Sequence, residues 1–292
     1  MCVSFKPAHF SATTLYAAVV GGLHVLGYQN TAQSIVGPNK DRDWDWDIEF
    51  DPTAGVGNAM LLPIPAMPGT MGQENVFATA LCKNILQDIG AAVSPRRDVA
   101  RSMLSFSDSM SIPKGVQIFE TDVFTDVLAD DPRKLAEVLA AIPQEKRPGL
   151  NVALLEAYAK WYPEWTMLLR CFSNTEPKKG LPLLCSYLPM YRDRLFAPAL
   201  DCHTGEVPNL KTLVDVDHTV AFGVAGDKIG SAVRYTDPSI PANVRPLLVG
   251  KVVGEKFDTR LQNGDFVCRV SDIIDGDFDY KRLPPPGAPR AA

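Results

Sequence analysis

The residues from 13 to 29, Thr-Thr-Leu-Tyr-Ala-Ala-Val-Val-Gly-Gly-Leu-His-Val-Leu-Gly-Tyr-Gln, decide the fold class. Two apolar runs, 13–20 and 23–29, flank the pair Gly21-Gly22. Glycine adopts the positive φ angles of a tight two-residue turn without a steric penalty, so this stretch is typical of a β-hairpin. We therefore predict a protein whose first sheet is built from antiparallel strands.

Similar apolar runs predict strands on both sides of this hairpin. The run at 58–65 contains two prolines, which cannot donate to a neighbouring strand, so we expect it at a sheet edge. Asn263-Gly264 is a common hairpin turn and predicts that 251–257 pairs with 266–270. The other expected strands are 2–5, 116–128, 166–172, 181–187, 195–202 and 218–223.

Three segments have the spacing of amphipathic helices. Apolar residues recur every four positions from 77 to 89 and predict a first helix at about 73–93. Asp131 is suited to cap a second helix, at 132–142, because its side chain can accept a backbone N–H of the first turn. A third helix at 150–162 follows after a short loop, so the last two should form an αα-hairpin. We therefore predict an α+β fold, with largely antiparallel sheets packed against about three helices.

The composition is that of a globular chain with one core. Of the 292 residues, 46% are apolar and 22% are charged. At this length, roughly three quarters of the unfolded surface can be buried on folding. No internal repeat or clear linker interrupts the chain, so we expect a single domain over residues 1–282. The residues from 283 to 292 are rich in proline and are expected to form a disordered tail.

Charge and cysteine usage indicate a cytoplasmic protein. The net charge is −5 and no run of lysine or arginine occurs, which counts against nucleic acids and anionic membranes as partners. The uncharged stretch 10–28 is explained by the hairpin rather than by a membrane span. The six cysteines form no CxxC pair, and five of them lie in apolar runs, as reduced and buried thiols do.

Common phosphate-binding and catalytic loops are absent from the sequence. Neither GxGxxG between a strand and a helix nor GxxxxGK[ST] occurs, which counts against dinucleotide and nucleoside triphosphate binding. GxSxG and HExxH are also absent. We therefore expect no cofactor.

The first five residues, Met-Cys-Val-Ser-Phe, carry a candidate nucleophile at Cys2. Removal of Met1 would leave a thiol and an α-amine on one residue, and an amine with a pKa of about 8 can serve as the base that activates the thiol. This start, followed by a hairpin, resembles N-terminal-nucleophile amidohydrolases of the choloylglycine-hydrolase and glutamine-amidotransferase kind. The resemblance implies an αββα sandwich with Cys2 as the catalytic residue.

The resemblance is limited to residues 1–5. The family has an early Arg and Asp after its first strand, and neither has a counterpart here, since the first arginine is Arg42. Asn30 and Asn58 are the candidates for oxyanion donors under this hypothesis. The alternative is that Cys2 is simply a small residue at the start of a strand.

Two short segments with acids and histidines suggest a metal site. Asp201 and His203 would point to one face of a strand, and so would Asp215 and Asp217. If the segments were neighbours, the four side chains could hold zinc, iron or manganese. The alternative is that they cap turns and bond to backbone amides.

From 41 to 51, acidic residues occupy every second position, and we call this segment the acidic–aromatic ribbon. In an extended chain its six carboxylates would lie on one face, with Trp44, Trp46 and Phe50 on the other. One interpretation is a solvated surface loop or an edge strand protected by its charges. The other is a docking ribbon in which Trp44 and Trp46 anchor a partner.

No constellation in the sequence specifies a reaction class, so our leading hypothesis is a non-catalytic binding or interaction protein. Its partner would be another protein or a second copy of the chain. The alternative is an amidohydrolase that uses Cys2. A metal-dependent hydrolase that uses Asp201, His203, Asp215 and Asp217 comes third.

Overall fold

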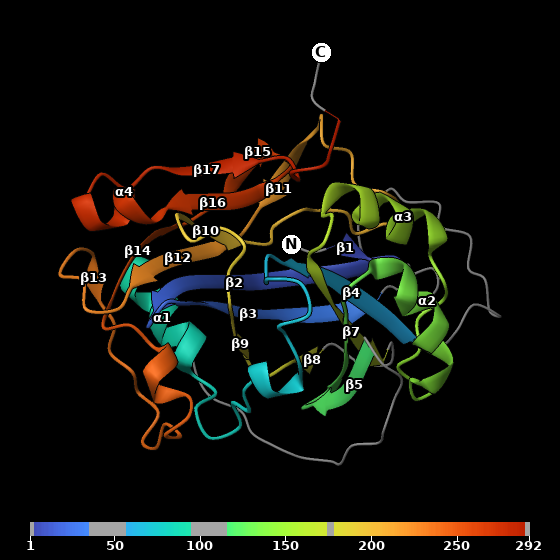
Figure 1. Ribbon diagram of the computed structural model, residues 1–292, viewed down its shortest axis with the longest axis horizontal. Coiled ribbons are helices and arrows are strands. Elements are labelled where there is room, and N and C mark those ends of the chain that lie inside the picture. The colour runs from blue at the N-terminus through green and yellow to red at the C-terminus, as the bar shows by residue number, and fades with distance from the viewer. Residues whose placement is uncertain (1–2, 35–56, 95–115, 174–177, 290–292) are drawn as a thin grey trace, which may run out of the picture.

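The computed structural model describes residues 3–34, 57–94, 116–173 and 178–289, and this part of the chain is mainly β-sheet (Figure 1). Its strands form four sheets of seven, five, three and two strands, and in the largest sheet β9 pairs with β3 outside the main strand order. Most of the pairing is antiparallel, as the sequence predicted.

The largest sheet is built around one long hairpin, drawn in blue in Figure 1. Its strands are β2 (Ala8–Val20) and β3 (Leu23–Ser34), joined by Gly21 and Gly22 with φ angles of 57° and 85°. The predicted hairpin is therefore confirmed. On its other side, β2 pairs in parallel with β12 (Thr219–Val224). The order is β13-β14-β12-β2-β3-β8, and β9 also pairs with β3. The remaining strands here are β8 (Lys178–Lys179), β9 (Leu183–Tyr187), β13 (Ser231–Ala232) and β14 (Lys251–Lys256).

The five-stranded sheet is antiparallel throughout, in the order β1-β4-β7-β6-β5. Its strands are β1 (Val3–Ser4), β4 (Gly57–Ile64), β5 (Val116–Thr121), β6 (Phe124–Ala129) and β7 (Thr166–Ser173). Helices cover one face of this sheet, because Leu61 and Leu169 share an apolar cluster with Leu154 and Tyr158. Both α2 and α3 lie at this end of the molecule (green in Figure 1).

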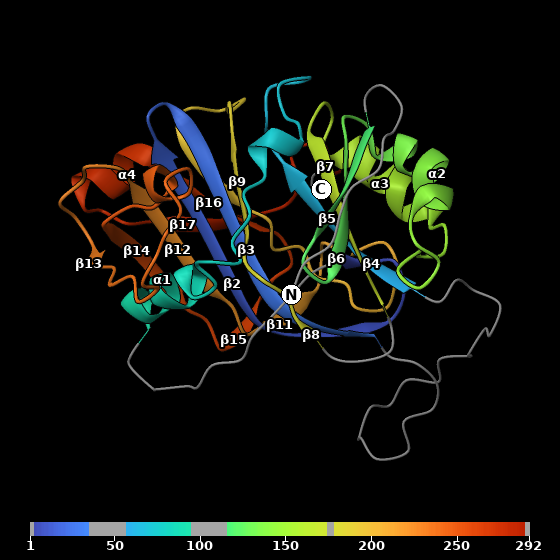
Figure 2. The same ribbon diagram turned by 90° about the horizontal axis from the view of Figure 1, so that it is seen from below.

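Two small sheets, in orange and red, lie above the blue hairpin in Figure 1. One has the order β10-β16-β17, with strands at Arg194–Ala197, Asp265–Arg269 and Tyr280–Leu283. The other pairs β11 (Leu213–Val216) with β15 (Thr259–Gln262). Figure 2, a view from below, shows the long β2–β3 hairpin between this region and the five-stranded sheet.

The prediction of a second hairpin, at Asn263-Gly264, is wrong. β14 pairs with β12 and β13, and β16 pairs with β10 and β17. The side chain of Asn263 bonds instead to the backbone of Asp201. Gly264 lies against β17, where a Cβ would come within 2.5 Å of Leu283 O. The pair therefore permits a close backbone approach rather than a hairpin turn.

Helices are few and short, so the α+β expectation is wrong. The α-helices are α1 (Ile85–Val93), α2 (Leu135–Val138), α3 (Val152–Trp161) and α4 (Val270–Asp275), with single 3-10 turns at Gln73–Asn75, Pro132–Lys134, Leu139–Ala141 and Arg245–Leu247. The helix expected at 73–93 begins only at Ile85, because Val76 and Phe77 bond to β9 as an extended chain. None of the described helices is long and apolar enough to cross a membrane.

The αββα sandwich implied by the amidohydrolase resemblance is also wrong. Such a fold has two stacked sheets with helical layers outside them, whereas the strands of the described residues belong to four sheets. The helices against the two larger sheets, α1 to α4, are short and do not form continuous layers. The largest apolar cluster consists mainly of strand residues from distant parts of the chain, such as Leu15, Leu168 and Phe266.

The proline-rich segment begins inside β17, where Leu283 pairs with Asp265. Beyond it, Pro285 is buried and the Gly287 N–H donates to Trp161 O at 2.8 Å. A Cβ at Gly287 would meet Lys160 O at 2.1 Å, so this glycine permits close contact with the end of α3.

Candidate functional site

A cleft of about 800 Å³ opens where distant parts of the chain meet. The beginning of β2 supplies His9 and Phe10, and the segment 201–209, which follows β10, supplies further lining residues. The β11–β15 pair contributes its own side chains, including Val214 and Arg260. Because β2 and β15 are far apart in sequence, the cleft exists only in the folded protein.

All four residues predicted as metal ligands line this cleft, but they do not converge on one point. Asp201 Oδ1 lies 2.9 Å from His203 Nε2, and Asp215 Oδ1 lies 3.5 Å from Arg260 Nε. Asp217 accepts a backbone hydrogen bond from β2. Within the described residues, no group of three or more His, Cys, Asp or Glu is placed to hold a metal ion. The metal site therefore stays a prediction.

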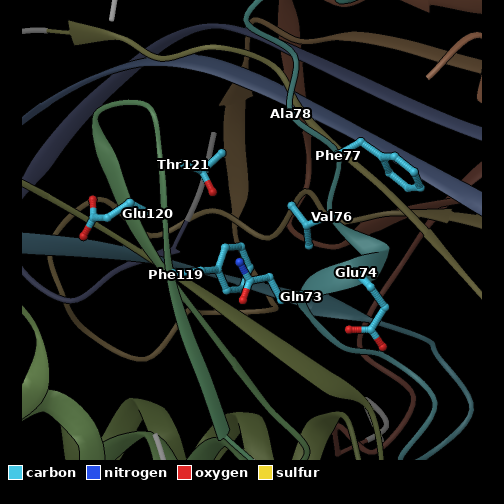
Figure 3. A pocket seen from close by; sticks show the side chains of 8 residues that line it. All are labelled: Gln73, Glu74, Val76, Phe77, Ala78, Phe119, Glu120 and Thr121. Carbon is cyan, nitrogen blue, oxygen red and sulfur yellow. The ribbon is translucent and has the colours of Figure 1, made fainter. Parts of the chain in front are cut away.

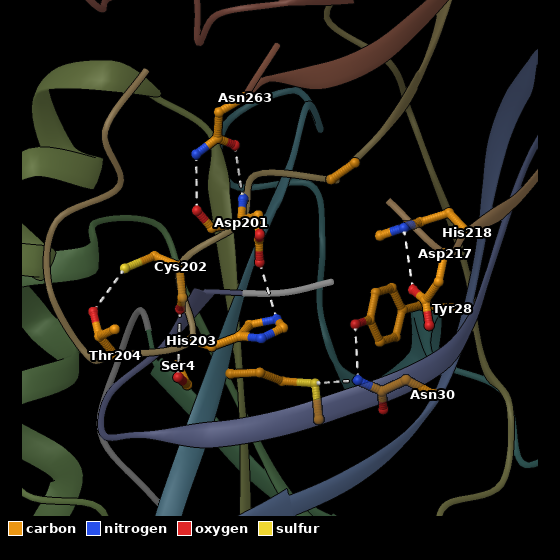
Figure 4. A network of polar contacts seen from close by, with 12 residues as sticks. Ser4, Tyr28, Asn30, Asp201, Cys202, His203, Thr204, Asp217, His218 and Asn263 are labelled. Carbon is orange, nitrogen blue, oxygen red and sulfur yellow. Dashed lines mark hydrogen bonds and ion pairs between the residues drawn. The ribbon is translucent and has the colours of Figure 1, made fainter. Parts of the chain in front are cut away.

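The Asp201–His203 pair is held in place by contacts on both residues (Figure 4). The Asp201 N–H donates to Asn263 Oδ1 at 2.9 Å, and Asn263 Nδ2 donates to Asp201 O at 2.8 Å. The His203 ring lies edge-on to Phe10, with ring centroids 5.3 Å apart. The side chains of Asp201 and His203 are 12% and 28% exposed, whereas the two paired atoms, Asp201 Oδ1 and His203 Nε2, are buried.

Asp217 stabilises an irregularity in β2. The register between β2 and β3 shifts between Ser11 and Thr14, and Ala12 has a φ of 53°, which is strained for a residue with a Cβ. The Ala12 N–H donates to Asp217 Oδ2 at 3.3 Å. The other carboxylate oxygen lies 3.6 Å from Nδ1 of His218, whose side chain is fully buried. Asp217 therefore joins the bulge in β2 to the start of β12.

Cys202 faces away from the imidazole of the residue that follows it. Its Sγ lies 3.3 Å from Thr204 Oγ1, and Figure 4 shows the sulfur on the side opposite His203. The backbone of Cys202 binds the first strand, since the Ser4 N–H donates to Cys202 O at 3.2 Å. Cys2, the predicted nucleophile, lies outside the described residues. The predicted docking residues Trp44 and Trp46, with the whole acidic–aromatic ribbon, also lie outside them.

Three further residues, Phe10, Asn263 and Arg260, line the cleft although no motif in the sequence marks them as part of a site. In the sequence, Asn263 is part of the Asn-Gly pair that predicts a hairpin turn. In the structure, its side-chain amide holds the backbone of Asp201. Phe10 sits in the uncharged stretch that was assigned to the hairpin. Arg260 has no distinguishing neighbour in the sequence, and its position follows from the pairing of β11 with β15.

Two buried ionisable groups outside the cleft have shifted pKa values. Burial raises the pKa of Asp265 to about 6, although hydrogen bonds from Tyr162 and two backbone amides oppose the shift. Burial lowers the pKa of His24 to about 4. At neutral pH Asp265 is therefore charged and His24 is neutral. Because both groups lie outside the cleft, their titration affects the stability of the fold rather than the charge of the cleft.

Comparisons with known proteins identify no family. No protein-family model matches the sequence, and no curated protein matches it. Among solved structures, the chain is similar to the crystal structure of baculovirus P35, with 14% identity and a TM-score of 0.41. The match covers 97% of this chain and 95% of that chain.

Proposed function

We propose that this protein is a non-catalytic binding protein whose cleft receives a positively charged segment of another protein. The observation that carries the proposal is the cleft itself, which combines apolar side chains with carboxylates that are held by their neighbours. Recognition sites typically have this composition, with a concave apolar surface and a few fixed polar groups.

The apolar part of the cleft comes from Phe10, Val214 and Val216. Phe10 and Val216 are almost fully buried, and Val214 packs partly against the same core cluster. Their backbones belong to β2 and β11, so these side chains form a firm base. The exposed apolar surface beside this base comes from Val207 and Leu213, and an aliphatic or aromatic partner side chain could cover it, at about 25 cal/mol for each Å² removed from water.

The charge of the cleft specifies the chemistry of the partner. Carboxylates from Asp201, Glu206, Asp215, Asp217 and Asp258 line it, and one arginine opposes them. A lysine or arginine of a partner would therefore be attracted, and an acidic segment would be repelled. Because Asp201 and Asp217 are already fixed by contacts within the chain, less side-chain freedom is lost on binding.

The test is a selection of random displayed heptapeptides on the full chain. We expect the enriched peptides to combine Lys or Arg with apolar residues, and their affinity to fall when NaCl is raised from about 50 to 500 mM. The double variant Asp215→Asn/Asp258→Asn should weaken binding about tenfold. Its matched control is Asp275→Asn/Asp277→Asn, which removes the same charge from exposed positions outside the cleft.

Binding that the cleft variant and the control variant weaken equally would contradict the proposal, because the effect would then depend on net charge alone. Enrichment of acidic peptides, or of no peptides, would also contradict it. Both double variants replace exposed carboxylates, so a melting curve close to that of the wild type should accompany each measurement.

A further inference from the structure

The strand β5 forms one edge of the five-stranded sheet, and within the described residues its backbone pairs only with β6. β5 and β6 are joined by a two-residue turn at Asp122 and Val123, with a φ of 59° at Asp122. This edge lies apart from the cleft, on the other large sheet.

The turn decides which backbone groups of β5 face outward. Thr121 and Phe124 are partners across the turn, and the closing pair of such a turn is hydrogen-bonded. Bonded and non-bonded pairs alternate along an antiparallel ladder. The amides of 117, 119 and 121 therefore point to β6, and those of Val116, Ile118 and Glu120 point outward.

A hollow of about 480 Å³ lies beside this edge. Figure 3 shows it between β5 and the segment 73–78, with Phe119 and Val76 between the two chains. The side chain of Gln117 accepts a hydrogen bond from the Gln73 N–H and thus connects the two sides. The hollow therefore offers apolar side chains next to unpaired strand backbone.

Three other sheet edges among the described residues are protected in ways that β5 is not. β17 carries Lys281 and Arg282, β13 is only two residues long, and the free side of β1 bonds to Cys202. Natural edge strands are usually blocked by such features, because an open edge pairs readily with another chain. β5 has six residues and contains no lysine, arginine or proline.

The charges around the hollow favour a basic partner. Its two charged lining residues are Glu74 and Glu120. The carboxylate of Glu120 is already engaged, since Lys146 Nζ lies 2.6 Å from Oε2 and Thr125 Oγ1 donates to Oε1 at 2.5 Å. Glu74 is exposed on the opposite side of the hollow and is left to attract a cation from outside.

We propose that an extended segment of a partner protein binds here as an added strand beside β5. Its backbone pairs with Val116, Ile118 and Glu120, an apolar side chain covers the half-buried Val76, and a lysine or arginine reaches Glu74. Main-chain pairing supplies affinity in this mode of recognition, and the side-chain pockets supply specificity.

The test uses heptapeptides selected on the full chain and sorted by the variants that abolish their binding. In Ile118→Pro the outward N–H is lost while the pairing with β6 is retained, since proline is tolerated where an edge N–H faces solvent. Binding should weaken about tenfold, whereas Ile118→Val should leave it unchanged. Glu74→Lys should also weaken binding of basic peptides, and this exposed change leaves β5 intact.

Amide hydrogen exchange gives a second readout that does not depend on a variant. In the complex with a selected peptide, exchange should slow at Ile118 and Glu120 and stay unchanged at Gln117 and Phe119. The proposal is overturned if no selected peptide loses binding with Ile118→Pro, or if protection does not alternate along β5. Peptides that are sensitive to Asp215→Asn/Asp258→Asn but not to Ile118→Pro would support the cleft and exclude this edge.

Discussion

Tyr162 Oη donates a hydrogen bond to Asp265 Oδ2 at 2.6 Å, and both side chains are buried. Tyr162 follows α3, and Asp265 begins β16, so this bond connects the helical end of the molecule to the three-stranded sheet. The other carboxylate oxygen accepts the backbone N–H groups of Ala199 and Leu200. A single buried acid thus joins three parts of the chain.

We predict that Tyr162→Phe destabilises the protein by about 1–3 kcal/mol, because it leaves a buried carboxylate oxygen without its donor. Urea unfolding monitored by circular dichroism measures the change. Tyr191→Phe is the control, since Tyr191 is 38% exposed and its hydroxyl can bond to water. Equal effects of the two substitutions would show that the bond to Asp265 adds nothing.

Asp265 and His24 should impose opposite pH dependences on stability. The pKa of Asp265 is raised from 3.8 to about 6, so its contribution is present below pH 4 and is lost as pH rises through 6. The pKa of His24 is lowered from 6.5 to about 4, so its contribution is lost as pH falls from 6.5 to 4. Each effect amounts to about 3 kcal/mol, and in the wild type they should largely cancel.

Single substitutions should reveal the two slopes. In Asp265→Asn, stability should rise with pH between about 4 and 6.5, and in His24→Gln it should fall over the same range. Urea unfolding at several pH values measures both, and the change of slope relative to the wild type is the quantity to compare. A slope that neither substitution alters would contradict the assignment.

The buried ion pair Arg170–Asp126 should be costly to break from one side. Arg170 Nε lies 2.8 Å from Asp126 Oδ1, both side chains are at most 2% exposed, and the guanidinium stacks on Phe124. Arg170→Met should lower the free energy of unfolding by about 3–5 kcal/mol, because it leaves a buried carboxylate without its partner. Adding Asp126→Leu should recover much of the lost stability. Arg133→Met, which breaks an exposed pair with Asp131, should cost at most about 1 kcal/mol.

Two glycines near β14 should respond very differently to alanine. Gly254 has a φ of 155°, and a Cβ there would lie 2.0 Å from Val220 O, so Gly254→Ala should cost about 1–3 kcal/mol. Gly250 has open space around its Cβ position, and Gly250→Ala should be nearly neutral. Thermal melts of the two variants provide the comparison.

The cysteines should differ in their rate of alkylation by iodoacetamide. Burial raises the pKa of Cys82 to about 11 and those of Cys185 and Cys268 to about 12, so these thiols should react slowly in the native protein. Cys202 is half-buried and should be the fastest of the described cysteines. If Cys2 is the nucleophile of an amidohydrolase, it should react faster still, and peptide mapping by mass spectrometry would detect it. Labelling of Cys2 no faster than that of Cys202 would contradict the hypothesis.

Some local signals in the sequence predicted the local structure correctly and others did not. Gly21-Gly22 marked a true hairpin, and Asp131 caps its turn by accepting the Arg133 N–H. The spacing of Phe77, Leu81 and Ile85 was misleading, since Leu81 is 66% exposed and residues 76–77 pair with a strand. Helical periodicity over four apolar residues could not outweigh backbone bonds to β9, which is over a hundred positions away.

The cleft was predictable only in part. Asp201, His203, Asp215 and Asp217 were grouped from their spacing, and they do line one cleft. Their actual partners are an imidazole, a guanidinium and a backbone amide, and two of these come from residues that only long-range pairing brings near. The spacing of acids within a segment fixes the face on which they lie, but not the groups opposite them.

The parallel pairing of β2 with β12 constrains how this chain can fold during synthesis. Thr14 is the register partner of Thr219, and the Ser4 N–H donates to Cys202 O. The strands that are synthesised first therefore cannot complete their pairing until residues about two hundred positions later have been synthesised. Contact order this high slows folding and leaves the apolar β2–β3 hairpin exposed on the ribosome. We therefore expect the nascent chain to depend on chaperones until β12 has emerged, and chains truncated before β12 to aggregate.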